Sequence, residues 1–236
     1  MKEHSIHQDS PSPVSDSLSP ASNSPVSATR RPLKTRSAGW SQSLARALAR
    51  SAITPNQISV LSVVFAALGG ALLLYFPTPI GLVLVALCVQ LRLLCNLLDG
   101  MVAVEGGKGS ALGVLYNELP DRLGDSLFLV PLGYAVGLGW LGWLCALLAA
   151  LTAYIRVTGG SLGLPQDFRG PQAKPHRMFV MTVGCLLAAV EVAVWGTTHA
   201  LLVAVVLIAV GTAATCVTRT LAMARLLQHP QGSARP

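Results

Sequence analysis

The sequence predicts an all-α integral membrane protein with six transmembrane helices and an N-terminal interfacial amphipathic helix. Hydrophobic residues make up 52% of the 236 residues and charged residues only 11%, whereas a soluble domain carries about 25% charged residues. The mean hydropathy is +0.58, and the apolar residues come in stretches long enough to cross a hydrocarbon core of about 30 Å. The five cysteines lie in apolar runs without paired spacing, which is typical of small buried hydrophobic residues and not of disulfides or a zinc site.

The N-terminal segment, residues 1–38, is rich in serine and proline and has almost no large apolar side chains. Such a composition cannot bury enough surface to fold, so we expect a disordered cytoplasmic tail. The segment also lacks the apolar core of a signal peptide, and nothing in it predicts cleavage.

Residues 39–52 follow with a helical pattern of two faces. Apolar residues share one face and arginines another: Trp40, Leu44 and Leu48 against Arg46 and Arg50. This pattern is typical of a helix that lies on a membrane surface, and an ordinary linker helix would show it equally well.

Residues 53–226 form the predicted six-helix transmembrane domain, and residues 227–236 a C-terminal tail. The predicted spans cover residues 54–76, 79–104, 110–136, 138–158, 175–195 and 198–225. Each span is long enough for the hydrocarbon core. The first begins at Thr54-Pro55-Asn56, which supplies a helix N-cap and a proline in the first turn.

The distribution of positive charge predicts the orientation. The connections near 76–79, 136–139 and 195–199 contain no lysine or arginine, whereas the longest loop, 157–176, is basic. Because cytoplasmic loops carry the excess of Lys and Arg, we expect a multi-pass protein of the cell inner (cytoplasmic) membrane with both termini in the cytoplasm. Aromatic residues fall at the opposite ends of the spans, as an interfacial belt would: Tyr75, Phe76, Trp140, Trp143 and Trp195. The net charge of +7 favours anionic membrane lipids, and not nucleic acid, as partners.

Five acidic residues interrupt the apolar pattern in two adjacent spans and their connection: Asp99, Glu105, Glu118, Asp121 and Asp125. One Asp at the centre of a membrane helix costs roughly 2.5–3.5 kcal/mol on insertion scales, so an ionisable residue there indicates a functional site. The cluster falls at the predicted cytoplasmic face, at the end of the second span and the start of the third.

Helical spacing places the polar residues on two stripes. Asn96 and Asp99 are three residues apart and share a face, and Asn117, Asp121 and Asp125 form a second stripe at intervals of four. The short glycine-rich connection indicates that the two helices are antiparallel neighbours. Two such faces would form a cage of oxygen ligands, which suits Mg²⁺, Mn²⁺ or Ca²⁺ better than zinc or copper.

Small residues surround the predicted cage. Gly100, Ala103 and Gly113 leave room for an extended ligand to approach the backbone closely. Mg²⁺ usually keeps part of its coordination shell for phosphates, so this combination points to a phosphate-bearing substrate.

This part of the chain resembles the CDP-alcohol phosphotransferase family, whose signature is D-x2-D-G-x2-A-R-x8-G-x3-D-x3-D. The chain reads Asn96-x2-Asp99-Gly100-x2-Ala103-Val104-x8-Gly113-x3-Asn117-x3-Asp121, which matches every spacing. Three residues differ, because the first and third aspartates are Asn96 and Asn117 and the arginine is Val104. The resemblance covers about residues 40–225.

The resemblance implies transfer of a phosphatidyl (phospho-alcohol) group from CDP-diacylglycerol, or another CDP-alcohol, to a small alcohol acceptor with release of CMP, in phospholipid synthesis. It further implies a transmembrane catalytic domain, a homodimer, and Mg²⁺ or Mn²⁺ as cofactor at the cytoplasmic face. Asp99 and Asp121 would bind the metal, and Asp121 would also be the general base. Asn96 and Asn117 would offer neutral oxygens. Glu118 and Asp125 could restore part of the lost charge, and Asp125, which lies outside the signature, is a further candidate metal ligand by its spacing on the second stripe.

By the same resemblance, Gly100, Ala103 and Gly113 would line the nucleotide, and Lys108 is a candidate to replace the missing signature arginine. A second, basic set is expected to hold a lipid or acceptor phosphate: Arg156, Arg169, Lys174 and Arg177. These residues could instead serve only as positive-inside anchors. Arg92, within the second span, is expected to pair with the carboxylates for structure.

Other functions remain open on the sequence. The chain could use a different CDP-alcohol or be a diverged, weakly active relative, since three signature residues differ. A cation-coupled transporter is disfavoured because the sequence has no obvious internal repeat and its charged cluster lies at one membrane face. No motif specifies the acceptor alcohol.

Overall fold

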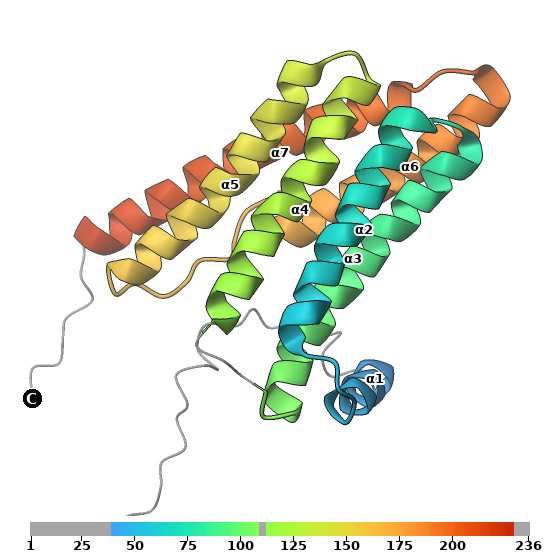
Figure 1. Cartoon of the computed structure of the whole chain (residues 1–236). Helices are drawn as coiled ribbons and strands as arrows, with labels where there is room; N and C mark the ends of the chain where they lie inside the picture. The colour runs from blue at the N-terminus through green and yellow to red at the C-terminus, as the bar shows by residue number, and fades with distance from the viewer. Residues whose placement is uncertain (1–38, 109–111, 229–236) are drawn as a thin grey trace, which may run out of the picture. The chain divides into compact units, whose positions relative to one another are not determined.

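The computed structural model describes residues 39–108 and 112–228, and all regular secondary structure in these ranges is helical (Figure 1). In chain order the helices are α1 (Gly39–Ala49), α2 (Pro55–Tyr75), α3 (Pro79–Glu105), α4 (Gly113–Ala135), α5 (Gly139–Ser161), α6 (Lys174–Trp195) and α7 (His199–Gln228). This arrangement confirms the predicted all-α class. The predicted N-terminal tail and most of the predicted C-terminal tail lie outside the described residues.

Five helices, α2, α3, α5, α6 and α7, are long and apolar enough to cross a membrane, so the chain is a multi-pass membrane protein. Helix α4 coincides with the predicted third span, but it carries four charged residues: Glu118, Asp121, Arg122 and Asp125. Because of these charges, α4 is not among the helices whose length and composition alone would allow them to cross a membrane. Six spans therefore stay a prediction.

The six long helices form a closed ring of contacts. Helix α2 packs on α3, α3 on α6, α6 on α7, α7 on α5, α5 on α4, and α4 again on α2. The sequence predicts α3 and α4 as packed neighbours, but α2 packs against both of them, and direct α3–α4 packing is slight within the described residues. The polar side chains of α3, α4 and α6 nevertheless reach one another, as the candidate site shows.

A glycine pair in α2 makes this packing possible. A Cβ atom at Gly69 would stand 2.4 Å from Phe128 Cε1 on α4 and 3.0 Å from Cys88 Cβ on α3. A Cβ atom at Gly70 would stand 2.2 Å from the Leu127 carbonyl oxygen. Because real Cβ atoms do not approach their neighbours so closely, only glycine lets α2 lie against α3 and α4 at once.

The main apolar core lies inside the ring and draws residues from all six long helices, among them Leu82, Phe128, Leu132, Met181 and Ile208. The five cysteines are free, and four of them are buried. They therefore act as apolar core residues, as the sequence predicts.

Helix ends follow local sequence signals. Thr54 caps α2 as predicted, because its Oγ1 accepts from Gln57 N at 3.3 Å while Gln57 Oε1 accepts from Thr54 N at 2.9 Å. At the opposite end of the bundle, the Glu191 carboxylate accepts hydrogen bonds from the backbone N–H groups of His199 and Ala200, each at 2.8 Å. Glu191 thus satisfies the first N–H groups of α7 and fixes the turn between α6 and α7.

The two ends of the bundle differ in their connections. Short connections at 76–78, 136–138 and 196–198 join the helices at one end. The predicted belt residues lie at this end, each more than half exposed: Tyr75, Phe76, Trp140, Trp143 and Trp195. The α3–α4 connection, the α1–α2 linker and the longer segment 162–173 lie at the other end, where the candidate site is found.

Helix α1 packs on the bundle through its small residues. Ser41 and Ala45 are fully buried, and Ala45 belongs to a small apolar core that includes residues of α2 and α3. Trp40 and Leu44 remain exposed. This apolar face is available to a membrane surface, and the interfacial placement of α1 stays a prediction.

Candidate active site

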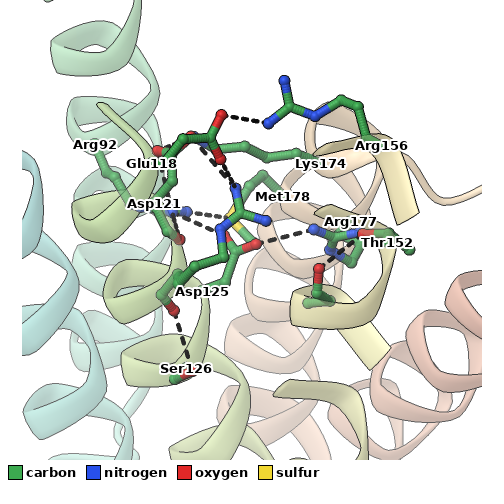
Figure 2. A network of polar contacts seen from close by, with 12 residues as sticks. Arg92, Glu118, Asp121, Asp125, Ser126, Thr152, Arg156, Lys174, Arg177 and Met178 are labelled. Atoms are coloured by element: carbon green, nitrogen blue, oxygen red, sulfur yellow. Dashed lines mark hydrogen bonds and ion pairs between the residues drawn. The ribbon is translucent and has the colours of Figure 1, made fainter. Parts of the chain in front are cut away.

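The charged residues of α4 meet basic residues from three other helices (Figure 2). Glu118, Asp121 and Asp125 lie on successive turns of α4. Their partners come from distant parts of the sequence: Arg92 on α3, Arg156 on α5, and Lys174 and Arg177 on α6. Together these residues form a polar network at the end of the bundle that carries the long connections.

Asp125 is the centre of a buried ion triad. Its side chain is 2% exposed, and Arg92 Nη2 donates to Oδ1 at 2.7 Å while Arg177 Nη2 donates to Oδ2 at 2.9 Å. The two arginine side chains are 0% and 1% exposed. Charges buried this deeply must be paired, so the triad is a structural element of the bundle.

Arg92 is held from several sides. Its Nη1 lies 3.2 Å from Met178 Sδ, its Nη2 donates to the Asp121 carbonyl oxygen at 3.0 Å, and its guanidinium lies 5.9 Å from the centroid of the Phe128 ring. Gly124 makes room for the guanidinium, because a Cβ atom there would stand 2.5 Å from Arg92 Nε. The predicted pairing of Arg92 with the carboxylates is therefore present.

The triad gives a structural partner to two residues whose ligand roles stay predictions. The sequence pattern predicts Asp125 as a metal ligand and Arg177 as a phosphate ligand, but in the structure they bind each other. Helix α6 brings Arg177 to a carboxylate 52 positions earlier in the chain, and Arg177 Nη1 donates to the Gln172 carbonyl oxygen at 2.9 Å. Since both Asp125 oxygens already accept from arginines, we leave both residues out of the proposed ligand sets.

Asp121 pairs with Lys174, the first residue of α6. The Lys174 ammonium donates to Asp121 Oδ1, whereas Oδ2 lies 3.7 Å from Arg122 Nη2, beyond hydrogen-bond distance. The Asp121 side chain is 17% exposed. Lys174 is thus directed to a carboxylate, and its role as a phosphate ligand stays a prediction.

Glu118 and Arg156 form a more exposed ion pair. Arg156 Nη1 also donates to Gln166 Oε1 at 3.0 Å, and its guanidinium lies 5.5 Å from the centroid of the Phe168 ring. A small cavity beside Arg156 is lined by Arg219 as well. Two basic side chains therefore border one cavity at the site end of the bundle.

Arg169 and Arg219 organise the segment that precedes α6. Arg169 is 75% exposed and binds Asp167 through Nε at 3.0 Å and Nη2 at 3.1 Å. Arg219, which the sequence pattern does not single out, is buried and donates to the carbonyl oxygens of Arg169 and Thr152, each at 2.8 Å. Arg219 thus ties this segment to α5 and α7.

Asp99, on α3, forms no ion pair with any residue in the described part of the chain. It is 6% exposed, and its two oxygens accept from neutral donors: Ser59 Oγ at 2.8 Å and the Gly100 backbone N–H at 2.5 Å. Sequence reasoning missed Ser59, whose only signal is a hydroxyl group within an otherwise apolar span. The hydrogen-bond donors that hold this buried carboxylate are therefore neutral.

Two amides belong to the predicted metal set. Asn96, one turn before Asp99, has a buried side-chain nitrogen without a hydrogen-bond partner among the described residues. An orphaned polar atom of this kind indicates a missing partner, and rotating the amide would present its carbonyl oxygen to a cation. Asn117, on α4, is exposed.

The predicted metal cage combines two amides with three carboxylates, and two of these carboxylates have basic partners in the structure. Within residues 39–108 and 112–228, no three His, Cys, Asp or Glu side chains are grouped so that they could hold a metal ion. Asp125 is bound by arginines and Asp121 by Lys174. Asp99 with Asn96 offers oxygen ligands of the kind that suits a divalent cation, and the number of metal ions bound stays a prediction.

The predicted nucleotide-binding residues lie around the α3–α4 connection. Gly100 and Ala103 are half-buried in α3, and Gly113 begins α4. Lys108 Nζ donates to the Ser51 carbonyl oxygen at 2.6 Å, so it fastens the α1–α2 linker to this connection. Its replacement of the missing signature arginine stays a prediction.

Known proteins similar to this chain identify its family. No protein-family profile matches the chain. The phosphatidylinositol phosphate synthase of Mycobacterium tuberculosis is 28% identical over 192 residues, which cover 75% of this chain and 82% of that protein. The phosphatidylinositol phosphate synthase of Mycolicibacterium smegmatis is 30% identical over 156 residues, which cover 63% of this chain and 68% of that protein. The chain belongs to the CDP-alcohol phosphotransferase family.

Solved structures agree with this assignment. The crystal structure of the Mycobacterium tuberculosis phosphatidylinositol phosphate synthase with CDP-diacylglycerol bound has a TM-score of 0.66 at 25% identity, covering 79% of this chain and 94% of that one. The same synthase in complex with manganese and citrate has a TM-score of 0.64 at 26% identity, and the match covers 78% of this chain and 88% of that one.

A further sequence relative is an inner membrane protein of Escherichia coli. It is 27% identical over 139 residues, which cover 58% of this chain and 69% of that protein.

Two carboxylates, Asp99 and Asp121, stand at the signature positions that the sequence predicts. The structure brings a lysine from outside the signature to one of them and leaves the other with neutral donors.

Proposed function

We propose that this chain transfers a phosphatidyl group from CDP-diacylglycerol to an acceptor alcohol with release of CMP, as a membrane enzyme of phospholipid synthesis. Family membership supports the reaction class, and the related Mycobacterium tuberculosis synthase has CDP-diacylglycerol bound in its crystal structure. The observation that carries the proposal is the polar network at one end of a bundle of apolar helices (Figure 2). At that end a soluble nucleotide can leave while acyl chains stay beside the exposed apolar helix faces.

In this reaction the acceptor hydroxyl oxygen attacks the phosphorus that carries the diacylglycerol. The new P–O bond replaces the bond from that phosphorus to the bridging oxygen, which leaves with its electron pair as part of CMP. The hydroxyl proton goes to Asp121 Oδ2, the oxygen that Lys174 does not engage. The Lys174 ammonium, which donates to Oδ1, holds the carboxylate in place.

The proposed cofactor is a divalent cation, Mg²⁺ or Mn²⁺, held by Asp99 with Asn96. A set of oxygen donors without thiols suits these ions, and the related synthase has been crystallised with manganese. When bound, such an ion neutralises negative charge on the diphosphate and on the CMP leaving group.

Basic side chains beside the network are proposed to bind the phosphate of the lipid or of a phosphorylated acceptor. Arg156 is the best placed of the predicted set, because it is 15% exposed and borders the cavity that Arg219 also lines. Arg169 lies at the same end with a largely exposed side chain. A planar guanidinium binds phosphate through two parallel hydrogen bonds.

We further propose that six helices, α4 included, cross the inner membrane with the site and both termini on the cytoplasmic side, and that the chain forms a homodimer, as the family resemblance implies. The charges of α4 are paired inside the bundle, which lowers the cost of placing this helix in a membrane. Basic residues gather at the site end and the five predicted belt residues lie at the other, which favours this orientation.

A direct assay tests the proposed function. Purified full-length protein in lipid nanodiscs, given CDP-diacylglycerol, Mn²⁺ and one alcohol at a time, is expected to release CMP in proportion to a new phospholipid. The panel should contain free and phosphorylated polyols and serine. Binding of CDP-diacylglycerol without CMP release from any acceptor would identify a diverged relative without catalysis. Cation flux across vesicles without CMP release would favour a transporter.

Arg156→Ala is expected to raise the KM for the lipid or the acceptor about 10- to 150-fold, because a charge-assisted hydrogen bond contributes roughly 1.5–3 kcal/mol. Arg156→Lys should rescue only in part, since lysine keeps the charge but loses the planar guanidinium. Steady-state CMP release at limiting concentrations of each substrate measures the effect.

Glu118→Gln is the matched control, because it breaks the same ion pair and keeps the arginine. If Arg156 binds substrate, Glu118→Gln should leave the KM unchanged or lower it. The substrate phosphate then no longer competes with the Glu118 carboxylate for the Arg156 guanidinium. An equal rise in KM for Arg156→Ala and Glu118→Gln would show that the pair acts only on structure.

A further inference from the structure

The carboxylates of the polar network are already balanced by basic side chains of the same chain. Glu118, Asp121 and Asp125 each pair with members of one basic set: Arg92, Arg122, Arg156, Lys174 and Arg177. With Asp99 included, four carboxylates face five cations. The cluster therefore carries an excess of positive charge before any metal ion binds.

The signature positions add to this imbalance. Asn96 and Asn117 stand where the family signature has aspartate, so two negative charges are missing from the predicted metal set. The two remaining carboxylates differ in their surroundings. Among the described residues, Asp99 accepts hydrogen bonds from neutral donors, whereas Asp121 has three basic neighbours: Lys174 on Oδ1, Arg122 at 3.7 Å and Arg92 at 4.0 Å.

Lys174 is held firmly at Asp121. It begins α6 between two anchored residues, Gln172 and Arg177. Gln172 N donates to Thr215 Oγ1 on α7 at 2.9 Å, and Arg177 donates both to the Gln172 carbonyl oxygen and to Asp125 at 2.9 Å. The Lys174 side chain is 22% exposed, so it lies largely inside the network, as Figure 2 shows.

We propose that Lys174 is a positioning residue that supplies, as a fixed ammonium group, the positive charge at Asp121 that a second divalent cation would otherwise supply. The chain then holds a single divalent cation, on Asp99. This inference rests on the proposed function, because it concerns the same site. A second divalent ion would have only Asp121 as a charged ligand, and it would meet three basic groups within 4.0 Å of that carboxylate, which Coulomb repulsion disfavours.

The test is the Mn²⁺ stoichiometry of the full-length protein in nanodiscs, measured from the electron paramagnetic resonance signal of free Mn²⁺. We expect one equivalent for the parent. Lys174→Met should bind its Mn²⁺ at least about tenfold more tightly, because a nearby positive charge is gone. The double variant Lys174→Met with Asn117→Asp should bind a second equivalent, since it removes the ammonium and restores a carboxylate.

Two variants serve as controls. Lys174→Arg keeps the charge and should still bind one equivalent. Arg169→Met removes an exposed positive charge from the segment that precedes α6 and should leave both stoichiometry and affinity unchanged. If the Lys174→Met proteins do not fold, Lys174→Gln takes their place. Two tight equivalents in the parent, or one equivalent in the double variant, would overturn the inference.

Activity is read separately from metal binding. A parent protein that binds one Mn²⁺ and releases no CMP with any acceptor would refute the proposed function and leave the role of Lys174 standing. A parent that binds two Mn²⁺ and releases CMP would refute the role of Lys174 alone.

Discussion

Asp121→Asn is expected to lower CMP release about 10²–10⁴-fold, the usual cost of losing a general base, while the protein still folds and binds nucleotide. In the parent, Lys174 donates a hydrogen bond to Asp121 Oδ1. Asparagine keeps a side-chain oxygen that can accept this hydrogen bond. It cannot take the proton of the acceptor hydroxyl. Single-turnover CMP release measures the chemical step, and calorimetric titration with CDP measures nucleotide binding.

The matched control for this prediction lies one turn earlier on the same helix. Glu118 is also a carboxylate in an ion pair with a basic residue, but it has no assigned part in the chemistry. Glu118→Gln should therefore keep the turnover of the parent. If Asp121→Asn retains turnover and Asp99→Asn loses it without losing Mn²⁺, the base is Asp99 and not Asp121.

Helix positions could be predicted closely from this sequence because a membrane span requires an unbroken apolar stretch. The bounds of the predicted helices agree with the structure to within a few residues, and the Thr54 cap follows from local sequence alone. Which helices pack together is not local information. Gly69 and Gly70 let α2 lie against both α3 and α4, and no spacing rule within α3 or α4 shows this.

The candidate site was predictable in its residue types and in the pairing of Arg92 with the carboxylates, but not in the pairings that α6 supplies. Spacing correctly placed Asp121 and Asp125 on one face of a helix. Two carboxylates one turn apart can nevertheless have different partners on the neighbouring helix. Asp125 meets Arg177, which arrives from 52 positions later in the chain, and Asp121 meets Lys174. The general rule that buried charges must be paired predicts that such partners exist, whereas only the packing of α6 shows which they are.

The buried triad yields the largest expected effect on stability. Asp125→Asn removes the only carboxylate that binds both Arg92 and Arg177 among the described residues. Arg177 then lacks a counter-charge among the described residues, and Arg92 keeps only the more distant Asp121 carboxylate at 4.0 Å. Removing one partner of a buried ion pair costs about 3–5 kcal/mol. We expect this loss in the free energy of unfolding, measured by reversible denaturant titration in detergent micelles, with Asn117→Ala on the exposed face of α4 as the control that should change little.

A charge-free triad separates the two roles that Asp125 could have. Buried ion networks can be replaced by apolar residues of similar volume at little cost or with a gain in stability, so Arg92→Met, Asp125→Leu and Arg177→Met combined should recover most of the stability that Asp125→Asn loses. Mn²⁺ binding should be the same in Asp125→Asn as in the parent, because both Asp125 oxygens accept from arginines. An Asp125→Asn protein that is as stable as the parent but no longer binds Mn²⁺ would return Asp125 to the metal site, as its spacing on α4 predicts, and would show that the arginine contacts contribute nothing to stability.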